Sequence, residues 1–144
     1  MATVERSIVI QATTDDIDAI ALDGARLPEW YVGVERAEPD DLYPEVGGQI
    51  DLTYKASGAT FHLTLTVREL ARGDYLVYEM SGMMTGTQRW WYESEGGATR
   101  TCAVVDYEMP GGALGKIADK LVVERMNAKN LEQSLENLKA VVEG

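Results

Sequence analysis

The chain has 144 residues, 45% of them hydrophobic, which suits a single compact domain over residues 1–144. Its formal net charge of −11 argues against nucleic acid as a partner, because backbone recognition needs a basic patch. No 18 consecutive apolar residues occur, and the first residues hold no apolar core of signal-peptide length. We therefore expect a cytoplasmic protein without stable membrane insertion. A single cysteine, Cys102, fits a reducing compartment.

The first third of the chain predicts a strand followed by two short helices. Residues 4–11 are rich in Val and Ile, which indicates a first strand. Residues 13–16 supply hydroxyl caps and acidic side chains for a helix start, and Asp23-Gly24 ends that helix. A second short helix or turn is expected at residues 27–31.

The middle of the chain predicts an antiparallel meander that begins near residue 34. Apolar and polar residues alternate with a period of two in residues 49–56, 61–68, 76–81, 89–94 and 100–109. The connections are short, so consecutive strands are expected to pair with one another.

Residues 111–144 predict one long amphipathic helix. Apolar residues recur at spacings of three, four and seven, at Leu114, Ile117, Leu121, Ala128, Leu131, Leu135, Leu138 and Val142. Such a helix needs an apolar surface, so we expect it to cover the dry face of the sheet. The predicted fold class is α+β.

Several local motifs accompany this order of elements. They are Leu27-Pro28-Glu29-Trp30, Val46-Gly47-Gly48, the hairpin at 92–99, the corner at 107–112, and the ending at 135–139. With these motifs the chain resembles, over essentially its full length, the START-related helix-grip superfamily (SRPBCC). That superfamily includes polyketide cyclases/dehydrases, Bet v 1-like allergens and lipid-transfer domains. The resemblance implies a curved antiparallel sheet of about seven strands around the long C-terminal helix, with a cavity between them.

The inward-facing residues decide what such a cavity holds. Their strand phase predicts an aromatic and aliphatic lining whose polar handles are hydroxyls and an indole N–H. The predicted ligand-binding residues of the strands are Tyr54, Phe61, Leu63, Leu65, Tyr78, Met80, Trp90, Tyr92, Thr101, Val105 and Tyr107. The resemblance adds entrance residues, namely Trp30, Tyr31, Leu114, Ile117 and Leu121. Ordinary core packing is the alternative interpretation for each of them.

The charged and reactive side chains fall on the opposite phase. Cross-strand ion pairs at a solvated surface explain Asp51, Lys55, Arg68, Glu79, Arg89, Glu93, Asp106 and Glu108. His62 faces outward, and a lone histidine cannot build a zinc site. Cys102 is also out of phase and is expected to be a small outer-face residue rather than a nucleophile. We therefore predict no metal, no cofactor and no titratable group suited to acid–base catalysis in the cavity.

The leading hypothesis is binding or transport of a small hydrophobic or aromatic molecule. The alternative is an aromatic polyketide cyclase/dehydratase, which can fold a reactive chain in a shaped pocket with few acid–base groups. A third class is an interaction module that uses the outer sheet face and Trp91. The loop at residues 82–86, with two methionines, is either a lid or an ordinary hairpin turn. Whether the chain is an enzyme, and whether it is a monomer or a homodimer, stays open.

Overall fold

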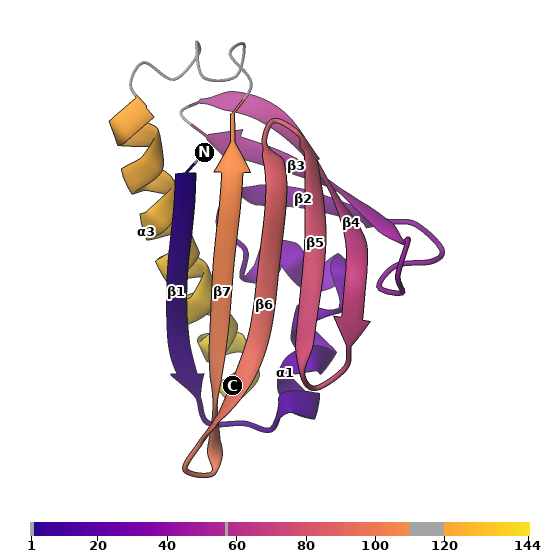
Figure 1. The fold of residues 1–144 in the computed structure, drawn as a ribbon, viewed down its shortest axis with the longest axis vertical. Helices are drawn as coiled ribbons and strands as arrows, with labels where there is room; N and C mark the ends of the chain where they lie inside the picture. The colour runs from indigo at the N-terminus through magenta and orange to yellow at the C-terminus, as the bar shows by residue number, and fades with distance from the viewer. Residues whose placement is uncertain (1, 57, 110–119) are drawn as a thin grey trace.

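The computed structural model describes residues 2–56, 58–109 and 120–144. In chain order its elements are β1 (Ala2–Ile10), α1 (Thr14–Ala21), the 3-10 helix η1 (Gly24–Glu29), β2 (Val34–Pro39), β3 (Gln49–Ala56), β4 (Ala59–Ala71), β5 (Tyr75–Gly82), β6 (Thr85–Glu95), β7 (Ala98–Glu108) and α3 (Lys120–Glu143) (Figure 1). The start of the predicted C-terminal helix and the corner before it lie outside the described residues.

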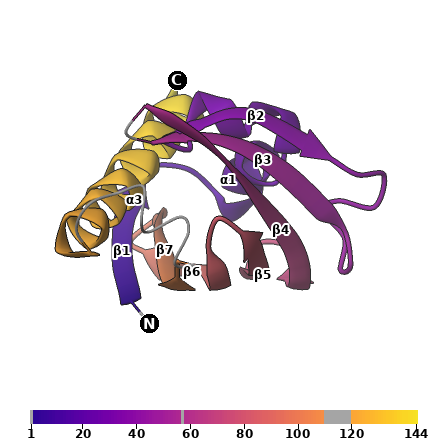
Figure 2. The ribbon, with the colours of Figure 1, turned by 90° about the horizontal axis from the view of Figure 1, so that it is seen from above.

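The seven strands form one antiparallel sheet in the order β1-β7-β6-β5-β4-β3-β2. Strands β2 to β7 are a meander, as predicted, and β1 closes the other edge by pairing with β7, from Ala2 opposite Tyr107 to Ile10 opposite Thr99. Register shifts in β2 and in β4, between Val67 and Glu69, mark bulges that increase local twist. Figure 2 shows the sheet curling until β2 and β3 lie across from β5, β6 and β7. This is the predicted helix-grip fold.

Helix α1 begins where its capping residues predict. The Thr13 side chain accepts a hydrogen bond from the Asp16 N–H at 3.2 Å, which satisfies one of the free donors of the first turn. The Asp23 carboxylate caps η1 in the same way through the Ala25 N–H at 3.2 Å. Helix α1 lies inside the curve of the sheet (Figure 2), and η1 packs against β2.

Helix α3 packs against β1, α1 and η1. Its buried face contains Leu131, Leu135 and Leu138, as predicted, together with Val123. The placement of Leu121 on this face is wrong, because its side chain is 53% exposed. At 3.6 residues per turn, Leu121 and Val123 point about 160° apart, on opposite edges of the apolar stripe. Periodicity alone could not tell which edge the sheet covers.

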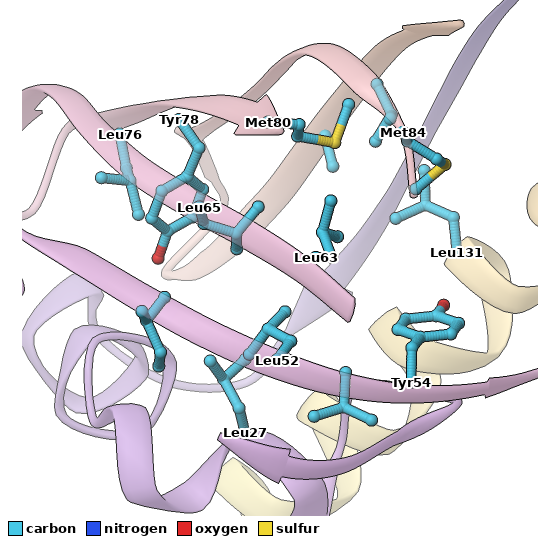
Figure 3. Packing of buried hydrophobic residues seen from close by; sticks show 14 of the residues in the cluster. Leu27, Leu52, Tyr54, Leu63, Leu65, Leu76, Tyr78, Met80, Met84 and Leu131 are labelled. Atoms are coloured by element: carbon cyan, nitrogen blue, oxygen red, sulfur yellow. The ribbon is translucent and has the colours of Figure 1, made fainter. Parts of the chain in front are cut away.

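The core follows the predicted strand phase. Leu52 of β3, Leu63 and Leu65 of β4, and Met80 of β5 are nearly inaccessible, and Figure 3 shows such side chains converging from facing strands, η1 and α3.

On the opposite phase, His62 is exposed and Arg68 pairs with Glu79 at 2.9 Å. Cys102 is in register with Ser7 and Trp91 and is 5% exposed, because its neighbours cover it.

Candidate functional site

A first cavity of about 30 Å³ lies between α1, η1, the middle strands and the C-terminal half of α3. Seven predicted ligand-binding residues line it: Trp30, Tyr31, Leu65, Tyr78, Trp90, Tyr92 and Thr101. The other described lining residues are Asp18, Ala21, Leu22, Leu27, Leu70, Tyr75, Leu76 and Leu138. The wall is therefore mostly apolar, as the strand phase predicts.

Two polar groups of this wall have no hydrogen-bond partner among the described residues. Trp30 is 3% exposed and Thr101 is 1% exposed. Within the described part of the chain, neither the indole Nε1 of Trp30 nor the hydroxyl of Thr101 has a hydrogen-bond partner. A buried polar group without a partner costs about 1–3 kcal/mol, so such groups in a cavity wall favour a ligand that satisfies them.

A carboxylate also reaches the first cavity. Asp18 of α1 accepts a hydrogen bond from the Tyr92 hydroxyl at 2.6 Å and another from the Gly73 N–H at 2.6 Å. Burial, and then this hydrogen bond, raise the pKa of Tyr92. The predicted lining, with hydroxyls and an indole N–H as its only polar groups, is therefore wrong, because Asp18 adds a carboxylate. Sequence reasoning followed only the strands, and the position of Asp18 depends on how α1 packs on the β4–β5 turn.

A buried glutamine organises the aromatic side chains, and sequence reasoning missed it. Gln88 of β6 is inaccessible to solvent; its Nε2 donates to the Tyr31 hydroxyl at 2.9 Å and to the sulfur of Met80 at 3.4 Å. Its Oε1 accepts from Nε1 of Trp90 at 3.1 Å. Gln88 lies two residues before Trp90, so the period of two already placed it inward. Burial raises the pKa of Tyr31 to about 12, against a smaller opposing effect of Gln88.

Sequence reasoning predicted Tyr78 as a site residue but missed the tyrosine that stacks on it, Tyr43. The hydroxyls of Tyr43 and Tyr78 are 2.6 Å apart, and their rings are stacked with an interplanar angle of 3°. Burial raises the pKa of both phenols. Tyr43 belongs to the β2–β3 connection, which carries no periodic signal, so its approach to β5 could not be predicted.

A second cavity, also of about 30 Å³, lies nearer the beginning of α3. The predicted residues Tyr31, Tyr54, Val105 and Tyr107 line it, together with Val4, Met84, Asn127, Asn130 and Leu131. Burial raises the pKa of Tyr54. Nδ2 of Asn127 faces the buried hydroxyl of Tyr107 and opposes the rise that burial causes in the pKa of that phenol. Neither group has another hydrogen-bond partner among the described residues. Met84, from the loop predicted as a lid or a hairpin turn, is buried here.

The remaining predicted site residues lie elsewhere. Phe61, Leu63 and Met80 are buried in the core but do not line either cavity. Leu121 is not among the described lining residues of either cavity, and Leu114 and Ile117 lie outside the described residues. Contact of the cavity residues with a ligand stays a prediction.

The described residues give little support for a thiol nucleophile, a metal site or a membrane-spanning helix. Burial raises the pKa of the Cys102 thiol to about 11, so little thiolate forms at neutral pH. In residues 2–56, 58–109 and 120–144, no group of three or more His, Cys, Asp or Glu side chains is placed to hold a metal ion. Over the same residues, every helix is too short or too polar to cross a membrane.

Solved structures share this fold at low sequence identity. A protein from Thermus thermophilus superposes with a TM-score of 0.81 at 20% identity, over 98% of this chain and 97% of that one. A START superfamily protein from Mycobacterium smegmatis gives 0.80 at 18% identity, over 98% and 97%. The di-domain ARO/CYC StfQ of the steffimycin biosynthetic pathway gives 0.76 at 17% identity, over 98% of this chain and 50% of StfQ.

The sequence matches a family profile but no individual curated protein. A comparison with curated protein sequences found no significant match. Residues 1–143, almost the whole chain, match the family profile described as polyketide cyclase / dehydrase and lipid transport. The chain therefore belongs to this family.

Proposed function

We propose that this protein binds a small hydrophobic molecule with at least one hydrogen-bonding oxygen in the first cavity. The observation that carries the proposal is an apolar wall with two buried polar groups, Nε1 of Trp30 and the hydroxyl of Thr101, that find no partner in the described part of the chain. An oxygen acceptor on the ligand satisfies the indole, and a hydroxyl or carbonyl satisfies the threonine. Family membership supports this class of ligand, in agreement with the sequence-based hypothesis.

Binding requires the cavity to enlarge. A volume of about 30 Å³ holds only a few water molecules. Pockets for small organic ligands typically measure about 300–1,000 Å³. Side chains of the wall must therefore move when a ligand enters, and burial of apolar surface at roughly 25 cal/mol per Å² provides the driving force.

A fluorescence experiment tests the proposal. The neutral apolar dye N-phenyl-1-naphthylamine is titrated into the protein, and displacement by 1-naphthol is then followed. We expect saturable dye binding, and a loss of 1-naphthol affinity of about three- to tenfold in Trp30→Phe.

The matched control is Trp91→Phe. Its indole lies on the outer face and donates to Glu93 at 3.0 Å, so this variant should retain the affinity. Absence of saturable dye binding to the native protein, or equal effects of the two substitutions, would contradict the proposal.

The contact between Asp18 and Tyr92 favours a second candidate function, an aromatic polyketide cyclase/dehydratase. A carboxylate can take the proton from a carbon between two carbonyls, and the enolate then attacks a distant carbonyl to form a carbon–carbon bond and an alkoxide. The alkoxide takes the proton back from the carboxyl group, and the resulting alcohol loses its hydroxyl with a proton of the adjacent carbon as water. Asp18 is the one carboxylate among the described residues of the first cavity.

The second candidate is tested with a poly-β-keto thioester surrogate. Cyclisation by the native protein that is lost in Asp18→Asn, while dye affinity is retained, would establish it. Dye binding without any cyclisation would leave the carrier function.

Three further expectations belong to this proposal. A cytoplasmic location is supported by the single cysteine. Absence of nucleic acid as a partner is supported by the net charge of −11. We further expect the protein to act as a monomer or homodimer.

A further inference from the structure

One side chain, Tyr31, belongs to the walls of both cavities. It follows η1, and its ring lies near aromatic side chains of both cavities. Its ring centroid lies 5.5 Å from that of Trp30 and 6.5 Å from that of Trp90, which line the first cavity. It lies 6.4 Å from that of Tyr54, which lines the second cavity, in an edge-to-face arrangement. The phenol ring of Tyr31 is thus shared by the two cavities and is called the partition below.

Gln88 holds this partition in place. A fully buried glutamine is costly unless its amide is satisfied, and here Nε2 donates to the Tyr31 hydroxyl while Oε1 accepts from Trp90. The same side chain thus fixes both the partition and one wall of the first cavity. The hydrogen bond from Gln88 opposes displacement of the Tyr31 hydroxyl.

The chemistry of the two cavities is alike. Each holds about 30 Å³, far below the size of a ligand site. Each wall is largely apolar and contains buried polar groups with unused hydrogen-bonding capacity among the described residues. These are Trp30 and Thr101 in the first cavity. In the second, Nδ2 of Asn127 faces the oxygen of Tyr107, and the hydroxyl proton of Tyr107 has no described acceptor. A single molecule that spans both cavities would form hydrogen bonds with polar groups at its two ends. Its middle would bury apolar surface against the walls.

We propose that the two cavities are chambers of one site, that Tyr31 is the partition between them, and that its displacement admits an elongated apolar molecule with an oxygen function at each end. Gln88 is the positioning residue that sets how readily the partition opens. This inference rests on the proposed function, because it extends the ligand from the first cavity into the second.

Ligand length is the property to measure. A series of α,ω-alkanediols with 4 to 14 carbons, matched by 1-alkanols of the same lengths, displaces N-phenyl-1-naphthylamine from the protein. Neutral probes are chosen because the net charge of −11 repels anions. In the native protein we expect long diols to bind more tightly than long alkanols, since only a diol places an oxygen in each chamber.

Three variants separate the partition from general enlargement. Tyr31→Ala should raise the affinity for the longest diols at least tenfold relative to the shortest ones. Gln88→Leu should favour long diols severalfold, because it frees Tyr31 without removing it. Tyr78→Ala enlarges only the first chamber and should raise the affinity for bulky probes without changing the preference for length.

The outcomes distinguish the two proposals. No dye binding to the native protein would refute the proposed function itself. Dye binding with the same length profile in native protein, Tyr31→Ala and Gln88→Leu would overturn the partition while leaving the function intact. If circular dichroism shows Tyr31→Ala to be unfolded, Tyr31→Leu, which keeps an apolar side chain but shortens the partition, decides the question by the same length comparison.

Discussion

Replacing Thr101 by valine should stabilise the protein while weakening its binding of oxygen-bearing ligands. The hydroxyl of Thr101 is buried, and no described residue offers it a hydrogen bond. Valine has the same shape and an equal preference for strands, so the substitution removes the unsatisfied group without opening a void. We expect the free energy of unfolding to rise by about 1 kcal/mol, which corresponds to about 3 °C in Tm for a domain of this size.

The ligand effect has the opposite sign. Loss of one hydrogen bond of about 1 kcal/mol to a ligand oxygen lowers affinity about fivefold. We therefore expect Thr101→Val to weaken displacement of the dye by 1-naphthol about fivefold and to leave displacement by naphthalene unchanged. A hydroxyl whose role is only structural would not discriminate between these two probes.

Thr99→Val is the matched control. Thr99 lies on the same strand and is also buried, but its hydroxyl donates to the carbonyl oxygen of Ala12 at 2.8 Å. Its replacement should lower the free energy of unfolding by about 1 kcal/mol, because the hydrogen bond is lost. Urea denaturation and thermal melting measure both variants. Destabilisation by Thr101→Val equal to that of Thr99→Val, or unchanged 1-naphthol affinity, would refute the reasoning.

The remaining predictions concern the core, the outer face and pH. Leu135→Ala should lower the free energy of unfolding by about 2–5 kcal/mol in urea, since Leu135 is 1% exposed, and a loss below about 1 kcal/mol would remove it from the core. His62→Ala should retain both stability and dye affinity, because His62 is exposed on the outward phase; a large loss of affinity would mean that its strand faces the other way. Stability should be full below pH 9 and fall between about pH 9 and 12, because the unfolded chain releases protons that the folded state keeps on Cys102 and Tyr31 up to a pKa of about 11 and about 12; unchanged stability from pH 9 to pH 11 would contradict this.

The order of elements and the inward phase of the strands follow from the sequence alone. A strand shows only two faces, so alternation through β3 to β7 assigned Tyr54, Tyr78 and Thr101 to the interior without any knowledge of the fold. Capping residues likewise located the start of α1, because a cap is a contact between near neighbours in the chain.

The tertiary structure alone decided how that interior is divided. Asp18 reaches Tyr92 across 74 positions of the chain, and Gln88 meets Tyr31 across 57, so no local pattern could report either contact. The burial of Val123 in place of Leu121 depends on which edge of α3 turns toward the sheet. Periodicity records the face that a residue occupies within its own element. The polar contacts of the cavity depend on how separate elements pack together, which local periodicity does not record.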